Sequence, residues 1–227
     1  KVNLDGGLNV LEAARAAPSL ARVVFTSSLA VFGGSGLPDT VSDDTKITPM
    51  TTYGMTKAVN ELLLNDYTRK GFIDGRGARL PTVIIRPGKP NKAASGFASG
   101  VFREPLSGTD YELPVSNETR MAVSGYRTIV DGILTLHEAD SEAVGDDRSI
   151  NLPSISVTVA EMIEGLHRVA GNRPLGQIIA KPNPAIQAIC NGWPGRELAP
   201  RALALGLPAD KDLDSIIRAY IEDYANA

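Results

Sequence analysis

The sequence predicts an α/β fold, a doubly wound parallel sheet with a smaller C-terminal lobe. Short apolar segments typical of strands occur at residues 22–26 and 80–86, and each follows a helical pattern, at residues 3–17 and 53–69. Strands that alternate with helices of this length favour strand–helix–strand units and a parallel sheet. With 227 residues, of which 43% are hydrophobic, the chain can bury a core of ordinary size.

The first half of the chain supplies the elements of this sheet. The two helical patterns each have an apolar stripe at helical spacing. The stripes consist of Leu4, Leu8 and Leu11 in the first helix and Val59, Leu62, Leu63 and Tyr67 in the second. We expect Gly71 and the segment 75–77 to break the second helix, so that the next strand occupies residues 80–86.

The second half predicts a smaller lobe. Residues 88–120 are rich in Gly, Pro, Ser and Asn, and the segment 121–140 is expected to return to the main domain. Thr158 and Glu161 have the spacing of a capping box ahead of an apolar helix. We therefore expect residues 1–88 to form the later half of a dinucleotide-binding domain with the catalytic residues. Residues 89–227 are expected to form mainly a substrate-binding lobe.

Composition excludes several classes of partner. The net charge of −3 and the pI near 5.5 give no basic surface for nucleic acid. No apolar run approaches the roughly 20 residues of a membrane helix, so no membrane partner is expected. A single cysteine, Cys190, forms no intrachain disulfide and suits a reducing, cytoplasmic compartment. The two histidines, His137 and His167, lie far apart, so we expect no metal site.

Ser28, Tyr53 and Lys57 have the setting of a hydride-transfer site. Ser28 ends the run 21–28, a predicted short strand followed by a small polar turn, and open α/β sheets place their ligands at such strand ends. Lys57 follows Tyr53 by four positions, which on a helix puts the phenol and the ammonium on one face. A nearby cation favours the phenolate of a tyrosine, which is otherwise a weak base at neutral pH. Tyr53 could then accept a proton from an alcohol whose oxygen Ser28 also binds.

The Tyr-x-x-x-Lys spacing alone is a weak motif, because most such pairs are ordinary residues of a helix surface. Its context strengthens the hydride-transfer interpretation. A hydrophobic segment closed by glycines, residues 29–34, follows Ser28, and the strand after the helix ends in Pro87 and Gly88.

Four segments resemble successive motifs of the extended short-chain dehydrogenase/reductases, a family that includes nucleotide-sugar epimerases and dehydratases. They are residues 2–6, 23–33, 53–57 and 86–88. A narrower resemblance, to a dehydrogenase of small sugar acids in that family, rests on residues 86–95, 97–100, 103–106, 192–194, 201–206 and 217–222. The resemblance implies a Rossmann-like fold, NAD as cofactor, and a Ser–Tyr–Lys catalytic set of Ser28, Tyr53 and Lys57.

The resemblance also implies which residues bind the cofactor and the substrate. The cofactor set is Thr26, Ser27, Tyr53, Lys57, Pro87 and Gly88. The substrate set is Ser28, Lys89, Asn91, Lys92, Ser95 and Arg127. One of these basic residues is expected to bind a substrate carboxylate through a charge-assisted hydrogen bond. The alternative is that the two lysines are ordinary solvated residues of a loop.

The glycine-rich fingerprint that opens a dinucleotide-binding fold does not occur in this sequence. Gly33, Gly34 and Gly36 follow the serine and precede no apolar helix, so we interpret them as a loop. We therefore expect the first half of the sheet to be absent from this chain. The choice between NAD and NADP stays open, because the residue that contacts the ribose 2′ position would lie in that half.

The resemblance thus implies an NAD-dependent dehydrogenase that oxidises a four-carbon sugar acid at its 2-hydroxyl. Phe32 stands where the family usually has tyrosine, which disfavours a nucleotide-sugar ligand. Two alternatives remain: an epimerase or dehydratase that keeps NAD tightly bound, and an NAD-sensing protein without catalysis. We also expect a homodimer, because helices 3–17 and 53–69 carry more apolar residues than one sheet face requires.

Overall fold

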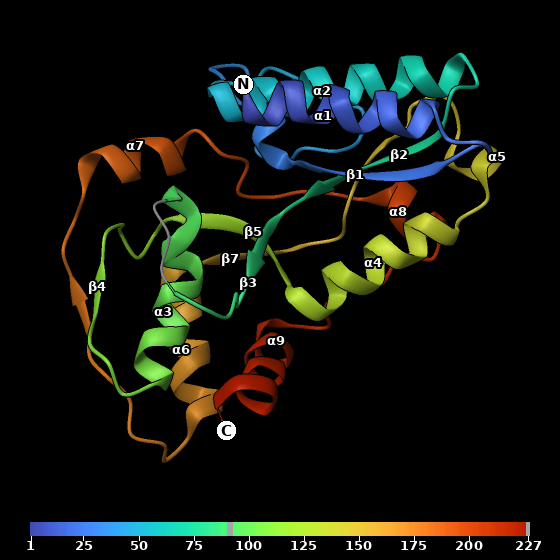
Figure 1. Cartoon of the computed structure of the whole chain (residues 1–227). Coiled ribbons are helices and arrows are strands. Elements are labelled where there is room, and N and C mark those ends of the chain that lie inside the picture. Colours follow the sequence, from blue (N-terminus) through green and yellow to red (C-terminus); the bar gives the residue numbers. More distant parts are fainter. Residues whose placement is uncertain (90–92, 226–227) are drawn as a thin grey trace. The chain divides into compact units, whose positions relative to one another are not determined.

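The computed structural model describes residues 1–89 and 93–225, and it divides into two compact units (Figure 1). The first unit comprises Lys1–Pro81, Val130–Pro153 and Leu198–Pro208. The second unit comprises Thr82–Ile129, Ser154–Glu197 and Ala209–Ala227. Each unit is described by itself below. The predicted functional division at residue 88 stays a prediction.

A parallel sheet forms the centre of the first unit, as the sequence predicts. Its strands are β1 (Arg22–Ser28), β2 (Asp74–Leu80) and β6 (Ser149–Asn151), in the order β1-β2-β6. Both pairings are parallel, and the register sets Ser28 opposite Leu80. Because all three strands run the same way, their carboxyl ends meet at one edge of the sheet, where Ser28 lies.

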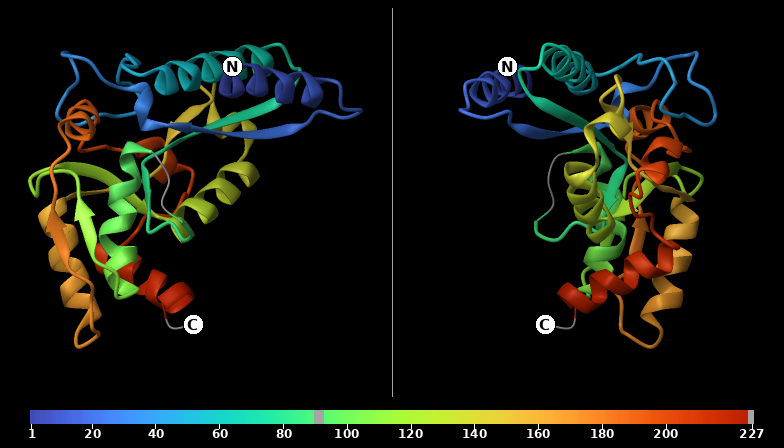
Figure 2. Two further views of the ribbon diagram at one scale, coloured as in Figure 1. Left: turned by 60° about the vertical axis from the view of Figure 1, so that its left-hand side comes forward. Right: turned by 90° about the vertical axis from the view of Figure 1, so that its right-hand side faces the viewer.

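Helices cover both faces of this sheet. Helices α1 (Val2–Arg15) and α2 (Thr52–Arg69) lie side by side on one face (Figures 1 and 2). Their buried core consists of Leu11, Leu64, Tyr67 and Ile73. Residues 130–138 of helix α4 (Tyr126–Glu138) lie on the other face. The remaining short helices of this unit are η1 (Leu29–Val31), α5 (Ser141–Val144) and α8 (Pro200–Ala204).

The strand predicted at residues 80–86 is only partly confirmed, and the break expected at residues 75–77 is wrong. The segment 75–77, which was expected to break the second helix, lies within strand β2. Only the short strand β3 (Thr82–Ile84) follows β2. A Cβ atom on Gly75 would lie 2.6 Å from Thr68 Oγ1, and one on Gly77 would lie 2.8 Å from Ser149 Oγ. These glycines therefore let helix α2 and strand β6 approach β2 closely, which is a known use of glycine inside a strand.

The second unit combines two small sheets with four main helices. Strands β3, β5 (Arg120–Gly125) and β7 (Ile155–Thr158) form a mixed sheet in the order β3-β5-β7, and β4 (Tyr111–Leu113) pairs with β8 (Ile178–Ala180). The helices are α3 (Phe97–Leu106), α6 (Val159–Ala170), α7 (Pro184–Asn191) and α9 (Leu213–Tyr220), with shorter turns at Ala94–Gly96 (η2) and Ile221–Ala225 (η3).

The interior of the second unit is apolar. Phe102, Val123, Met162, Leu166 and Ile217 are fully buried in one cluster. The predicted capping box at the start of α6 is confirmed, since the Thr158 side chain accepts a hydrogen bond from the Glu161 N–H and the Glu161 carboxylate accepts one from the Thr158 N–H. Among the described helices of the whole chain, none has the length and apolar character needed to cross a membrane.

Candidate active site

The carboxyl end of β1 carries three of the predicted site residues, and the structure gives each a different setting. Ser28 is extended, with φ −157°, and its Oγ accepts a hydrogen bond from Ala30 N at 3.2 Å, which caps the short helix η1. Ser27 is buried and donates to the carboxylate of Glu61. Thr26 is exposed and presents its carbonyl to Lys57. Of the three, Ser28 is the last residue of the strand, and it is partly exposed.

The first turn of α2 packs directly against η1. Thr51 caps the helix by accepting a hydrogen bond from Gly54 N at 3.0 Å. A Cβ atom on Gly54 would lie only 2.0 Å from the carbonyl oxygen of Ala30, so a larger residue would push the helix away. This close approach brings Tyr53, with 47% of its surface exposed, to the turn that follows Ser28.

Lys57 lies beside the phenol ring, as the four-residue spacing predicts. Its Nζ is 5.6 Å from the centroid of the Tyr53 ring and donates to the Thr26 carbonyl at 2.6 Å. Burial lowers the pKa of the Lys57 ammonium, and the carboxylate of Glu61 opposes part of that shift. The structure therefore brings Thr26, Tyr53 and Lys57 together, with a half-buried cation next to an exposed phenol.

A buried ion pair that sequence reasoning missed lies beneath these residues. Glu61 and Arg79 have side chains that are 2% and 3% exposed, and Arg79 binds the carboxylate through Nε at 3.1 Å and Nη2 at 2.9 Å. Because Ser27 donates to the same carboxylate, the pair connects β1, α2 and β2. Glu61 is at i+4 from Lys57 and i+8 from Tyr53, so its position on their helix face could have indicated this role.

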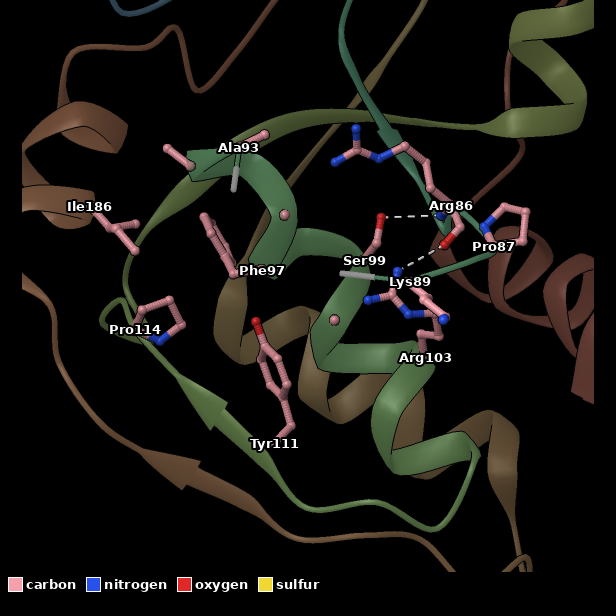
Figure 3. A pocket seen from close by; sticks show the side chains of 13 residues that line it. Arg86, Pro87, Lys89, Ala93, Phe97, Ser99, Arg103, Tyr111, Pro114 and Ile186 are labelled. Atoms are coloured by element: carbon pink, nitrogen blue, oxygen red, sulfur yellow. Dashed lines mark hydrogen bonds between the residues drawn. The ribbon is translucent and has the colours of Figure 1, made fainter. Parts of the chain in front are cut away.

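The second unit contains a pocket of about 250 Å³ (Figure 3). Its described lining comes from the loop after β3, from η2 and the residue before it, from α3, from β4 and the residue after it, and from α7. The lining residues are Arg86, Pro87, Lys89, Ala93, Ala94, Gly96, Phe97, Ser99, Gly100, Arg103, Tyr111, Pro114 and Ile186. Burial is the main cause that raises the pKa of Tyr111 to about 12, so its phenol stays protonated near neutral pH.

The structure places the predicted substrate residues in different surroundings. Lys89 lines the pocket, whereas Ser95 lies in η2 and is not among the lining residues. Arg127 binds Asp223 through Nε at 2.9 Å and Glu222 through Nη2 at 3.0 Å, away from the described lining. The remaining two, Asn91 and Lys92, lie outside the described residues. Their roles as substrate ligands stay predictions.

The residues present fit a nicotinamide cofactor in two respects. A half-buried lysine stands at the carboxyl end of a parallel sheet, which is where such sheets bind dinucleotides. Pro87 and Gly88 follow strand β3, and Gly88 has a φ of +93° with no described atom within 4 Å of the position of a Cβ. A backbone without a side chain at that point allows a flat ring to approach closely.

A parallel sheet with helices on both faces, and a tyrosine and a lysine of α2 beside the carboxyl end of β1, are features of a Rossmann-type, nicotinamide-dependent enzyme. The chain belongs to the NAD dependent epimerase/dehydratase family, whose model matches residues 1–150. This finding confirms the predicted family and NAD as the cofactor.

Three known proteins are especially similar to the chain. The D-erythronate dehydrogenase of Cupriavidus necator is 48% identical over 223 residues, which cover 98% of this chain and 68% of that protein. The D-erythronate dehydrogenase of Haemophilus influenzae is 45% identical over 214 residues, covering 94% and 68%. A crystal structure of a nucleoside-diphosphate-sugar epimerase from Agrobacterium tumefaciens has 44% identity and a TM-score of 0.91, covering 99% of this chain and 67% of that one.

Proposed function

We propose that the full-length enzyme oxidises D-erythronate at its 2-hydroxyl to the 2-oxo acid and reduces NAD to NADH. The observation that carries this proposal is the similarity to two D-erythronate dehydrogenases, which extends over 98% and 94% of the chain and so includes both units. The substrate is a small anion, and the chemistry is the removal of one proton and one hydride from a secondary alcohol.

The residues of the first unit have distinct roles in this reaction. Tyr53 Oη accepts the proton of the substrate hydroxyl, and Ser28 Oγ donates a hydrogen bond to the same oxygen. The Lys57 ammonium, held by the Thr26 carbonyl, stabilises the negative charge on the phenol oxygen and binds the cofactor ribose. When bound, NAD supplies the hydride acceptor.

The pocket of the second unit supports a small anionic substrate. Three of its described lining residues are cationic, Arg86, Lys89 and Arg103, and of these Arg103 is paired with Glu104, which is not among the described lining residues. Lys89 is our preferred ligand for the substrate carboxylate, because Arg127 already binds Glu222 and Asp223.

A nucleotide-sugar epimerase is the second candidate function. The observation that favours it is the 44% identity to the Agrobacterium tumefaciens structure of a nucleoside-diphosphate-sugar epimerase. The two candidates differ in their products, because an epimerase returns the hydride to its substrate within one cycle and so produces no net NADH.

Full-length enzyme incubated with NAD should therefore form NADH with D-erythronate and not with UDP- or dTDP-sugars, as measured by absorbance. Lys89→Gln should lower kcat/KM for D-erythronate by about 10- to 100-fold, because a hydrogen bond to a charged group contributes about 1.5–3 kcal/mol. Lys181→Gln, which removes an exposed lysine paired with Glu112 in the same unit, is the matched control and should leave kcat/KM unchanged. Conversion of a nucleotide sugar without net NADH would instead support the epimerase.

We also propose that the protein is a cytoplasmic homodimer. Apolar side chains are exposed on both helices of one face of the first unit, including Val10 at 59% and Leu62 at 65%. Two copies related by a two-fold axis would bury these side chains against each other. The single cysteine suits a reducing compartment.

Analytical ultracentrifugation of the full-length protein at micromolar concentration is expected to show a dimer. Leu62→Glu should shift it to monomer, because a carboxylate would have to be buried at the interface. Leu203→Glu is the matched control, since Leu203 is similarly exposed, at 56%, on α8 rather than on α1 or α2. A wild-type protein that sediments as a monomer contradicts the proposal.

A further inference from the structure

Helix α3 binds both main-chain polar groups of Arg86, the residue that precedes Pro87 and Gly88. Ser99 Oγ accepts the Arg86 N–H at 3.1 Å, and Arg103 Nη1 donates to the Arg86 carbonyl oxygen at 3.1 Å (Figure 3). Ser99 and Arg103 are four residues apart, so they lie on one face of the helix. We refer to these two side chains as the α3 clamp.

The clamp is itself held firmly in place. Ser99 is 1% exposed and the Arg103 side chain is 12% exposed. The remaining guanidinium nitrogens of Arg103 bind Glu104, through Nε at 3.0 Å and Nη2 at 2.5 Å. Arg103 therefore has little freedom to turn towards a ligand. The Glu104 carboxylate orients the guanidinium group, so that Nη1 points at the Arg86 carbonyl.

The orientation of the Arg86 carbonyl group restricts the backbone conformation of the next two residues, Pro87 and Gly88. It belongs to the planar peptide group that contains the nitrogen of Pro87, so a bond that fixes the oxygen fixes that whole plane. The proline ring then restricts the next φ to about −65°. Little freedom remains before Gly88, whose φ of +93° a residue with a side chain rarely adopts.

We propose that Ser99 and Arg103 are positioning residues for the cofactor, which act by holding in place Pro87 and Gly88, the residues that the family resemblance assigns to cofactor binding. The inference rests on the proposed role of Pro87 and Gly88 in cofactor binding and not on the identity of the substrate. Both clamp residues also line the pocket with Lys89, so the cofactor loop and the pocket share one wall.

Direct binding of NADH by the full-length enzyme, followed by fluorescence without any substrate, tests the clamp. Arg103→Met should raise the Kd about tenfold, the effect of losing one hydrogen bond to a charged group. Ser99→Ala should raise it about threefold, since a neutral hydrogen bond contributes less. Arg103→Lys, which keeps a cationic donor, should recover most of the affinity.

The double variant separates positioning from simple packing. Because both side chains act on the same residue, Ser99→Ala combined with Arg103→Met should raise the Kd little more than Arg103→Met alone. Ser107→Ala, at the end of the same helix, and Arg168→Met, which removes an exposed arginine paired with Asp214, are the controls and should bind NADH normally.

Two results would overturn the inference. The first is an Arg103→Met enzyme with the wild-type Kd for NADH. The second is a double variant whose fold-increase in Kd equals the product of the fold-increases of the two single variants. If Arg103→Met does not fold, the decision falls to Ser99→Ala, and an unchanged Kd there overturns the inference. An error in the sugar-acid assignment leaves this test intact, because no sugar acid is present in it.

Discussion

Phenylalanine in place of Tyr53 is expected to lower kcat by about 10²- to 10⁴-fold, the usual contribution of a general base, while NADH binding is kept. The substitution removes only the hydroxyl group that accepts the substrate proton. The ring remains, and so does its packing near the Lys57 ammonium, 5.6 Å from the ring centroid. With 47% of the side chain exposed, loss of the hydroxyl leaves no buried polar group without a partner.

Steady-state kinetics with D-erythronate and a separate NADH titration check this expectation. Tyr224→Phe is a matched control, because that tyrosine is similarly exposed, at 46%, and belongs to the C-terminal turn of the second unit. It should leave kcat unchanged. Turnover of the Tyr53→Phe enzyme above about a tenth of the wild-type value would be too small a loss for a general base and would remove Tyr53 from that role.

The local features of the site could be predicted from the sequence because they depend on spacing within one element. The four-residue offset of Tyr53 and Lys57 fixes their common helix face before any tertiary contact is known. The strand that leads to Ser28 and the capping box at Thr158 were likewise predicted from short segments. The identity of the cofactor, NAD, was predicted from the family resemblance and not from a local pattern.

Features that depend on contacts between distant segments could not be predicted in the same way. Gly75 and Gly77 usually indicate a break, and only the packing of α2 and β6 against β2 explains them in a strand. The buried pair of Glu61 and Arg79 joins residues 18 positions apart, and neither side chain alone indicates a partner. The pocket in the second unit collects residues from positions 86 to 186, a range that no local pattern connects.

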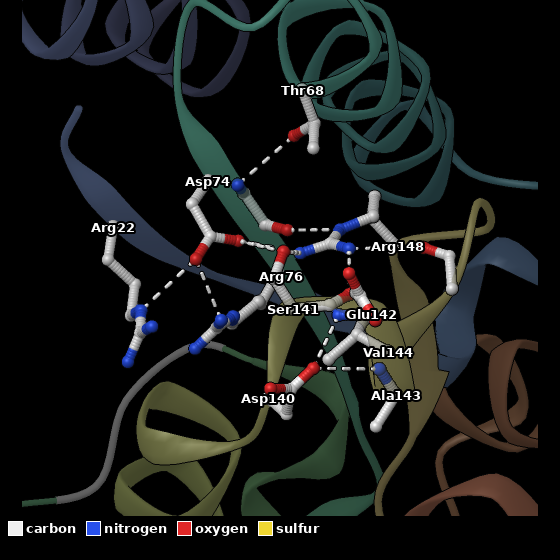
Figure 4. A network of polar contacts seen from close by, with 12 residues as sticks. Arg22, Thr68, Asp74, Arg76, Asp140, Ser141, Glu142, Ala143, Val144 and Arg148 are labelled. Atoms are coloured by element: carbon white, nitrogen blue, oxygen red, sulfur yellow. Dashed lines mark hydrogen bonds and ion pairs between the residues drawn. The ribbon is translucent and has the colours of Figure 1, made fainter.

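The amino end of β2 holds a second polar network, at the end of the strand opposite to the Ser28 edge (Figure 4). Asp74 accepts hydrogen bonds from Arg22 Nε at 3.1 Å, Arg76 Nη2 at 2.8 Å and Arg148 Nη2 at 2.7 Å, and from Ser141 Oγ at 3.0 Å. Burial is the main cause that lowers the pKa of both Arg76 and Arg148. The Asp74 carboxylate therefore contacts three guanidinium groups, of which those of Arg76 and Arg148 are removed from water, whereas Arg22 also pairs with the exposed Glu138 at 4.0 Å.

Most of the other hydrogen bonds of these arginines go to backbone carbonyls, although Arg148 Nη2 also donates to Ser141 Oγ at 3.2 Å. Arg22 Nη1 donates to the carbonyl of His137 at 2.9 Å, and Arg76 binds the carbonyls of Leu136 and His137 at the end of α4. Arg148 Nε donates to the Gly75 carbonyl at 2.7 Å. The carboxyl end of a helix carries a partial negative charge, so these contacts add to the balance, but partial charges do not replace a full anion.

Asp74→Asn is therefore expected to destabilise the protein by about 3–5 kcal/mol, the cost of removing one partner from a buried ionic network. The amide is similar in size to the carboxylate, so the loss comes from charge: Arg76 and Arg148 stay buried with no anion between them. Urea unfolding of the full-length protein measures the change. Asp66→Asn is the matched control, because Asp66 pairs with Arg69 and Lys70 on the exposed surface of α2, where ion pairs contribute little to stability. Equal unfolding midpoints for the two variants would show that the helix-end carbonyls alone balance the arginines, and that Asp74 is not the residue on which this end of the sheet depends.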